Sequence, residues 1–143
     1  MTPSVGIREM TRTANRGLVA VWDSIERSEG YLSMQDLIRS NLGDAAASSL
    51  DAPFAMGRDG VLESLFDDAD VKHVEFTSVE GTGRFDSISQ WATTEVRGWT
   101  LGDSVSDAHL ADLTANAEDH LARFTADDGV VFGMTAKVAT WKS

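Results

Sequence analysis

The pattern of hydrophobic and polar residues predicts three β-strands. The first is an apolar run from Leu18 to Trp22, which follows Gly17 and ends at Asp23. Because this run does not alternate with polar residues, we expect both faces of the strand to be covered. Residues 72 to 80 do alternate, which is typical of a half-buried strand near a sheet edge. Residues 130 to 141 begin with consecutive apolar side chains, which predicts a central strand.

Apolar residues at helical spacing predict helices between these strands. Residues 4 to 14 have the pattern of a helix that is stopped by Asn15 and Gly17. Two capping-box patterns, Ser33-x-x-Asp36 and Ser87-x-x-Gln90, precede further helices. A long helix is expected over residues 105 to 125. The order is therefore β, several α, β, two α, β, which indicates an α/β protein.

Length, charge and cysteine content restrict the possible functions. The chain has 143 residues, which predicts a single domain over 1–143. Its net charge of −11 repels phosphate backbones and anionic lipid, so we expect no nucleic-acid or membrane partner. The absence of cysteine excludes disulfides, thiolate zinc sites and a cysteine nucleophile. Because no apolar run reaches the ~20 residues of a membrane helix and no signal peptide is seen, we predict a cytoplasmic protein.

The polar residues form no motif of a known catalytic or metal site. Walker, nucleophile-elbow and zinc-protease motifs are missing. The histidines His73, His109 and His120 are expected to be solvated or capping residues. The acidic group around Asp67 and Asp70 lacks the spacing of a calcium loop, so we expect no metal site.

Aromatic residues give the best candidate for a binding site. Ligands bind beyond the carboxyl ends of strands in open α/β sheets, and Trp22 and Asp23 follow the first strand. Phe54 and Met56 are in a segment that would cover this end. We therefore predict a substrate-binding region formed by Trp22, Asp23, Tyr31, Phe54, Met56 and Trp91. The alternative is that these aromatic residues pack a helical layer onto the sheet.

Five segments of the chain are similar to segments of a known family: Arg8-Glu9-Met10, Arg16-Gly17-Leu18-Val19-Ala20-Val21-Trp22-Asp23, Ala52-Pro53-Phe54-Ala55-Met56-Gly57, Glu80-Gly81-Thr82-Gly83-Arg84-Phe85 and the strand that starts at Val130. In these segments the chain resembles the C-terminal half of class I S-adenosylmethionine-dependent methyltransferases, and is most similar to those of ubiquinone and menaquinone biosynthesis. The family turn before the fifth strand usually reads Pro-Gly-Gly, whereas this chain has Ala14-Asn15-Arg16-Gly17.

The resemblance implies part of a Rossmann-like fold: a three-stranded mixed sheet with a helical layer. The strand at residues 130–140 would lie antiparallel between the strands at residues 18–22 and 72–79. The family binds S-adenosylmethionine mainly with its first four strands, whose Gly-rich loop and acidic residue have no counterpart in this sequence. No cofactor-binding residue is therefore carried over, and we do not expect S-adenosylmethionine to bind this chain alone. The implied role is a substrate-side domain without autonomous methyl transfer.

The implied strand order leaves one side of the strand from Leu18 to Trp22 without a neighbour. An apolar edge of this kind pairs readily with another chain. We therefore predict self-association through this edge, or docking of a separate polypeptide that supplies the N-terminal half.

Two other function classes remain open. The chain is alternatively a dimeric α+β protein without catalysis, which binds a small hydrophobic ligand in a pocket lined by Trp22, Phe54, Trp91 and Trp99. The last class is an enzyme that uses histidine and aspartate as acid and base, although no spacing in the sequence brings such residues together.

Overall fold

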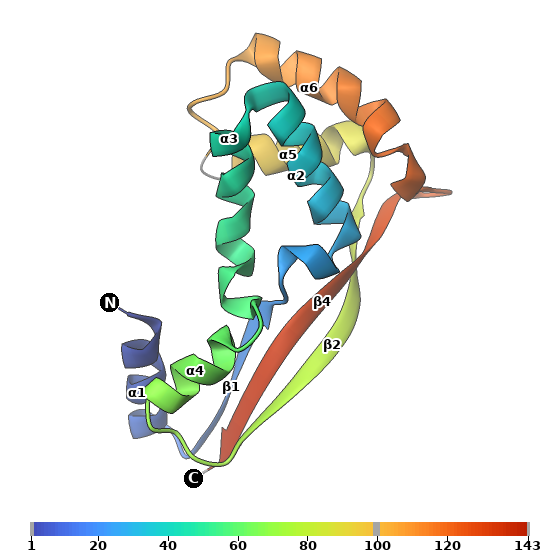
Figure 1. Cartoon of the computed structure of the whole chain (residues 1–143). Coiled ribbons are helices and arrows are strands. Elements are labelled where there is room, and N and C mark those ends of the chain that lie inside the picture. Colours follow the sequence, from blue (N-terminus) through green and yellow to red (C-terminus); the bar gives the residue numbers. More distant parts are fainter. Residues whose placement is uncertain (1, 99–100, 143) are drawn as a thin grey trace. The chain divides into compact units, whose positions relative to one another are not determined.

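The computed structural model describes residues 2–98 and 101–142 (Figure 1). It contains two compact units, which are described separately below. The first unit consists of Met1–Ser24, Pro53–Glu80 and Thr135–Ser143, and the second consists of Ile25–Ala52 and Gly81–Met134.

The described strands form an antiparallel sheet of four strands in an α/β chain. They are β1 (Arg16–Trp22), β2 (Val74–Phe85), β3 (Thr125–Ala126) and β4 (Gly129–Lys142). The order is β1-β4-β2, so the predicted central position of the last long strand is confirmed. The expectation of a three-stranded mixed sheet is wrong. The turn that follows Ala126 closes a hairpin, in which β3 pairs with the start of β4.

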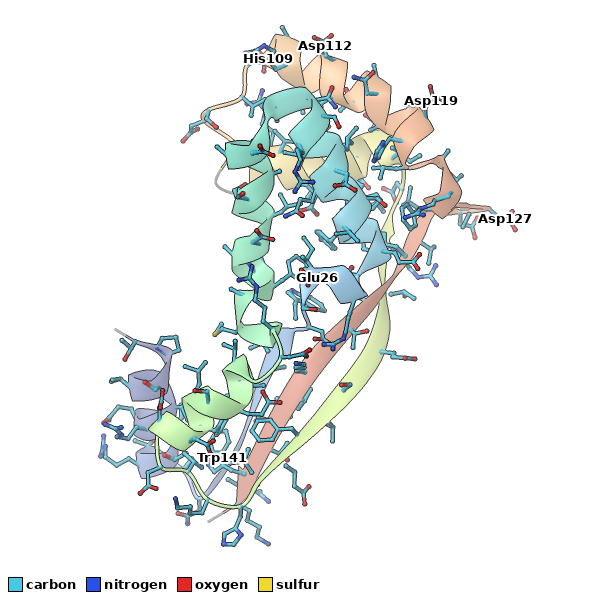
Figure 2. The ribbon with its side chains drawn as sticks, in the orientation of Figure 1. Glu26, His109, Asp112, Asp119, Asp127 and Trp141 are labelled. Carbon is cyan, nitrogen blue, oxygen red and sulfur yellow. The ribbon has the colours of Figure 1, made fainter. Side chains whose placement is uncertain are left out.

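In the first unit, two helices pack on one face of the sheet (Figure 1). These helices are α1 (Pro3–Thr13) and α4 (Val61–Asp68). The core of this unit contains Ile7 from α1, Phe66 from α4, and Trp141 from β4. The Phe66 ring and the Trp141 indole lie 5.9 Å apart between their centroids, and Figure 2 labels Trp141 beside α4.

Only one face of β1 is buried, so the expectation that both faces are covered is wrong. Val19 and Val21 pack against the core, whereas the side chains that alternate with them point to the other face. On that face Leu18 is 59% exposed and Trp22 is 45% exposed. The strand is apolar on both faces although the helices of this unit cover only one of them.

Gly17 is required by the packing of the Trp141 indole. These two residues are directly opposite each other in the β1–β4 ladder. A Cβ atom at position 17 would lie 2.2 Å from the indole ring, far inside van der Waals contact. The glycine before the apolar run therefore gives the indole the space in which it lies.

The second unit is largely helical. It contains α2 (Glu29–Leu42), α3 (Asp44–Ser48), α5 (Ile88–Gly98) and α6 (Asp107–His120), with the short 3-10 helices η1 (Ile25–Arg27) and η3 (Ala122–Phe124). The 3-10 helix η2 (Ser49–Gly57) begins in this unit and ends in the first. Helix α6 packs against α2 and α5. The long helix expected over residues 105 to 125 is confirmed, but it starts later and ends earlier than expected.

One of the two predicted capping boxes forms in part, because the Gln90 side chain accepts from the Asp86 N–H in place of the Ser87 N–H. The Gln90 N–H donates to the Ser87 hydroxyl at the start of α5, at 3.0 Å. The other prediction is wrong, because α2 begins at Glu29 and Ser33 lies inside the helix. There the Ser33 hydroxyl accepts a hydrogen bond from the Arg123 guanidinium at 2.7 Å. Ser33 therefore makes a tertiary contact between α2 and η3 and does not cap a helix.

None of the described helices combines the length and the apolar character needed to cross a bilayer.

Candidate functional site

The predicted site residues are divided between the two units. Trp22, Asp23, Phe54 and Met56 belong to the first unit, whereas Tyr31 and Trp91 belong to the second. Each group is therefore described separately. Trp99, which the alternative pocket requires, lies outside the described residues.

In the first unit, a small charged cluster lies at the carboxyl end of β1. Asp23 continues the ladder, because its N–H donates to the Thr135 carbonyl at 2.9 Å. Its carboxylate is buried and accepts a hydrogen bond from the Ser24 N–H at 2.8 Å. The Lys137 ammonium lies 3.7 Å from the Asp23 carboxylate and 3.3 Å from that of Asp59. We call Asp23, Asp59 and Lys137 the Asp23 cluster.

The Asp23 cluster is positioned by the register of β1 and β4. Lys137 is opposite Val21 and therefore points to the same face as the core residues of β4. A lysine on an apolar face is costly unless its charge is balanced, and the neighbouring carboxylates provide that balance. The cluster therefore holds a buried negative group in place at the strand end.

The chain passes very close to the end of β1 at Gly57. A Cβ atom at position 57 would lie 1.9 Å from the Trp22 carbonyl oxygen. This contact fixes the end of η2 against the strand end. In η2 the Phe54 ring is buried and the Met56 side chain is 40% exposed. Trp22 and Met56 thus give the first unit two exposed apolar side chains on segments that meet at Gly57.

In the second unit, a half-buried tyrosine and a buried glutamate form a polar pair. The Tyr31 hydroxyl donates to the Glu95 carboxylate at 2.9 Å, and Glu95 is 2% exposed. Burial raises the pKa of the Tyr31 phenol well above its ordinary value of 10.0, and the negative charge of Glu95 raises it further. At neutral pH the phenol is therefore a hydrogen-bond donor and not a base.

Trp91 is the centre of the aromatic core of the second unit. It has no exposed surface and stacks on the Phe132 ring, with centroids 4.3 Å apart. Phe85 is also stacked on it, while Phe124 and Tyr31 meet it edge-on. The indole N–H has no hydrogen-bond partner among the described residues. Trp91 therefore has a packing role in the core, which was the alternative to ligand binding that the sequence left open for the aromatic residues.

The histidines and acidic residues make no metal site in the part of the chain that the structure describes. His109 and Asp112 lie near the start of α6 (Figure 2), where the His109 N–H donates to the Ser106 hydroxyl that caps the helix. His73 lies beside β2, in a shallow groove of about 760 Å³ that Arg16, Leu18 and Lys142 also line. Asp67, Asp68 and Asp70 are exposed at the end of α4, as expected of a solvated helix end.

Sequence reasoning missed Lys137, Asp59 and Glu95. Lys137 could have been noticed, since it is a charged residue in the interior of a largely apolar strand. Glu95 could also have been noticed, because it follows Trp91 by four residues and so lies on the same face of the helix. Nothing in the sequence marks Asp59 as part of this cluster, because its side chain is exposed and its contact depends on where Lys137 lies.

The sequence was compared with known proteins. No protein-family model and no curated protein matches it.

Proposed function

We propose that this chain is the substrate-side part of a class I S-adenosylmethionine-dependent methyltransferase. The observation that carries the proposal is the strand order β1-β4-β2, with the long antiparallel strand in the middle. The sequence resemblance implies the same order for the last three strands of that family. These strands come from distant parts of the chain. Local sequence patterns predict where strands lie but not their order in the sheet, so the agreement between the observed and the implied order supports the resemblance.

The carboxyl end of β1 supports a role in holding the methyl acceptor. In the mostly parallel sheets of the family that this chain resembles, ligands bind beyond the carboxyl ends of the strands. Here the end of β1 carries the exposed Trp22 indole, followed by the buried carboxylate of Asp23. An indole offers a flat apolar surface to a ring-shaped acceptor, and the ion pair with Lys137 keeps the strand end rigid.

The carboxylate at the end of β1 is a poor ligand for the ribose of the methyl donor. A carboxylate that binds a ribose must be free to accept hydrogen bonds from its hydroxyls. The Asp23 carboxylate at the end of β1 is 5% exposed and already bonded to the Ser24 N–H and Lys137. We therefore propose that this chain contributes acceptor binding, and that methyl transfer by it alone is negligible because donor and acceptor are not held in line.

A titration with an apolar aromatic acceptor tests the proposal. The probe is a short-chain ubiquinol analogue, followed by tryptophan fluorescence. We expect saturable quenching, and a severalfold weaker affinity in Met56→Ala. Met10→Ala is the matched control, because Met10 is 39% exposed in the same unit but lies on α1. Quenching that is not saturable, or equal weakening in both variants, would contradict acceptor binding at this strand end.

The alternative function, a binding protein for a small hydrophobic ligand, needs Trp91 to line a pocket. Trp91 is instead fully buried between Phe132 and Phe85. This burial favours the first proposal.

A further inference from the structure

The amino-terminal end of β1 carries a positive charge that faces a second one across the sheet. Arg16 and Lys142 are directly opposite in the β1–β4 ladder. In the same ladder the Asp23 N–H bonds to the Thr135 carbonyl. Because hydrogen-bonded and non-hydrogen-bonded pairs alternate, Arg16 and Lys142 form a non-hydrogen-bonded pair, in which opposite side chains lie closest. Two cations in such a pair repel each other, so the pair favours an anion between them.

The described part of the chain provides no carboxylate that balances these two charges. Neither the Arg16 guanidinium nor the Lys142 ammonium forms an ion pair or a side-chain hydrogen bond within residues 2–98 and 101–142. Elsewhere in this unit the cations Arg12, Lys72 and Lys137 each form an ion pair. The charge at Arg16 and Lys142 is therefore available to a bound anion.

A groove with an apolar wall lies beside the two cations. It has a volume of about 760 Å³, and the first unit lines it with Arg16, Leu18, His73, Glu75 and Lys142, among others. Leu18 is 59% exposed on the sheet face that α1 and α4 leave uncovered. The groove therefore offers two positive charges next to an apolar surface, which suits a ligand with an anionic group and an apolar part.

We propose that this groove binds a small organic acid, with its carboxylate between Arg16 and Lys142 and its apolar part over Leu18. A guanidinium fits a carboxylate with two parallel hydrogen bonds, and an ammonium beside it adds a further charge-assisted bond. His73 lines the same groove, and its imidazole can donate one more hydrogen bond to the acid.

Glu75 restricts the acid to one negative charge. It lies on β2, which β4 separates from β1, so the groove is positive toward β1 and negative toward β2. A second carboxylate at the far end of the ligand would be repelled by Glu75. The groove is therefore selective for monoanions. It lies at the opposite end of β1 from Trp22, so its occupancy does not depend on the proposed acceptor binding.

An NMR titration of the backbone amides in the full chain tests the proposal, with hexanoate as the probe. Hexanoate joins one carboxylate to an apolar chain. We expect saturable shifts of the amide signals of residues 16–18 and 140–142. Adipate has the same number of carbons with a second carboxylate at the other end, and it should bind severalfold more weakly. Shifts that do not saturate, or that occur only elsewhere in the chain, would overturn the proposal.

Substitution of the cations separates this site from a general effect of charge. Arg16→Gln and Lys142→Gln should each weaken hexanoate binding about threefold, which is the effect expected of an exposed ion pair. Arg58→Gln is the matched control, because Arg58 is an exposed cation of the same unit outside the groove. It changes the net charge equally and should leave the affinity unchanged. Equal weakening by Arg58→Gln would overturn the proposal.

Glu75→Gln tests the selectivity for monoanions. It removes the repelling carboxylate, so it should strengthen adipate binding severalfold and hexanoate binding much less. Far-ultraviolet circular dichroism confirms that each variant is folded. Adipate that binds the unaltered chain as tightly as hexanoate would overturn the assignment to a monoanion.

Discussion

The fold alters the acid–base chemistry of Tyr31. Its phenol donates to the buried Glu95 carboxylate, and burial together with that charge raises its pKa. The unfolded chain titrates near the free value of about 10. Above that pH the unfolded state loses a proton that the folded state retains, so stability is complete below pH ~10 and falls as the pH rises further.

A pH titration of tyrosinate absorbance measures this shift directly. Tyr31 is the single tyrosine of the chain, so the signal has one source. We expect native protein to titrate well above the same protein in urea. Tyr31→Phe should remove the loss of stability that begins near pH ~10. A native titration at the free value would show that the pair with Glu95 does not form.

The close packing of η2 against the end of β1 requires a glycine at position 57. Alanine at this position would place a Cβ atom against the Trp22 carbonyl, and backbone atoms on both sides would have to move. We expect Gly57→Ala to lower the free energy of unfolding by about 1–3 kcal/mol.

Gly6→Ala is the control for this substitution. Gly6 lies in α1, and nothing in the structure is within 4 Å of the added Cβ atom. A helical alanine should therefore raise stability by about 0.5–1 kcal/mol. Urea denaturation measures both variants. Equal effects of the two substitutions would mean that the close approach at Trp22 is not present.

At the scale of elements, periodicity predicted the long strands and most helices, but not which faces are buried. The apolar run from Leu18 to Trp22 was expected to be covered on both sides, whereas its residues alternate between the core and solvent. Burial of a strand face depends on segments far away in the sequence, and here α1 and α4 cover one face only. The start of the helix predicted at Ser33 was wrong for a related reason. A local capping pattern cannot show that the helix already began at Glu29.

The candidate site was predictable only in part. The position of Trp22 and Asp23 at a strand end follows from the sequence pattern alone. The partners of Asp23 do not, because Lys137 reaches it through the β1–β4 register and more than a hundred residues of intervening chain. Trp91 was an equally good candidate for a core residue, and only its contacts with Phe132 and Phe85 assign it to the core.

At the scale of the whole molecule, the strand order leaves β1 at an edge of the sheet, with β4 as its neighbour on one side only. The long β4 strand lies between two edge strands, and the more apolar edge lacks the charges that protect β2. The residues proposed to bind the acceptor, Trp22 and Asp23, lie at the end of that same β1 strand.

Calorimetric titration of the full chain with S-adenosylmethionine is the decisive experiment for a substrate-side role. We expect no saturable heat of binding, because the sequence contains no Gly-rich donor loop and the Asp23 carboxylate is already engaged by Ser24 and Lys137. Saturable binding at micromolar concentration would contradict it, since the chain would then hold the methyl donor without any further strands.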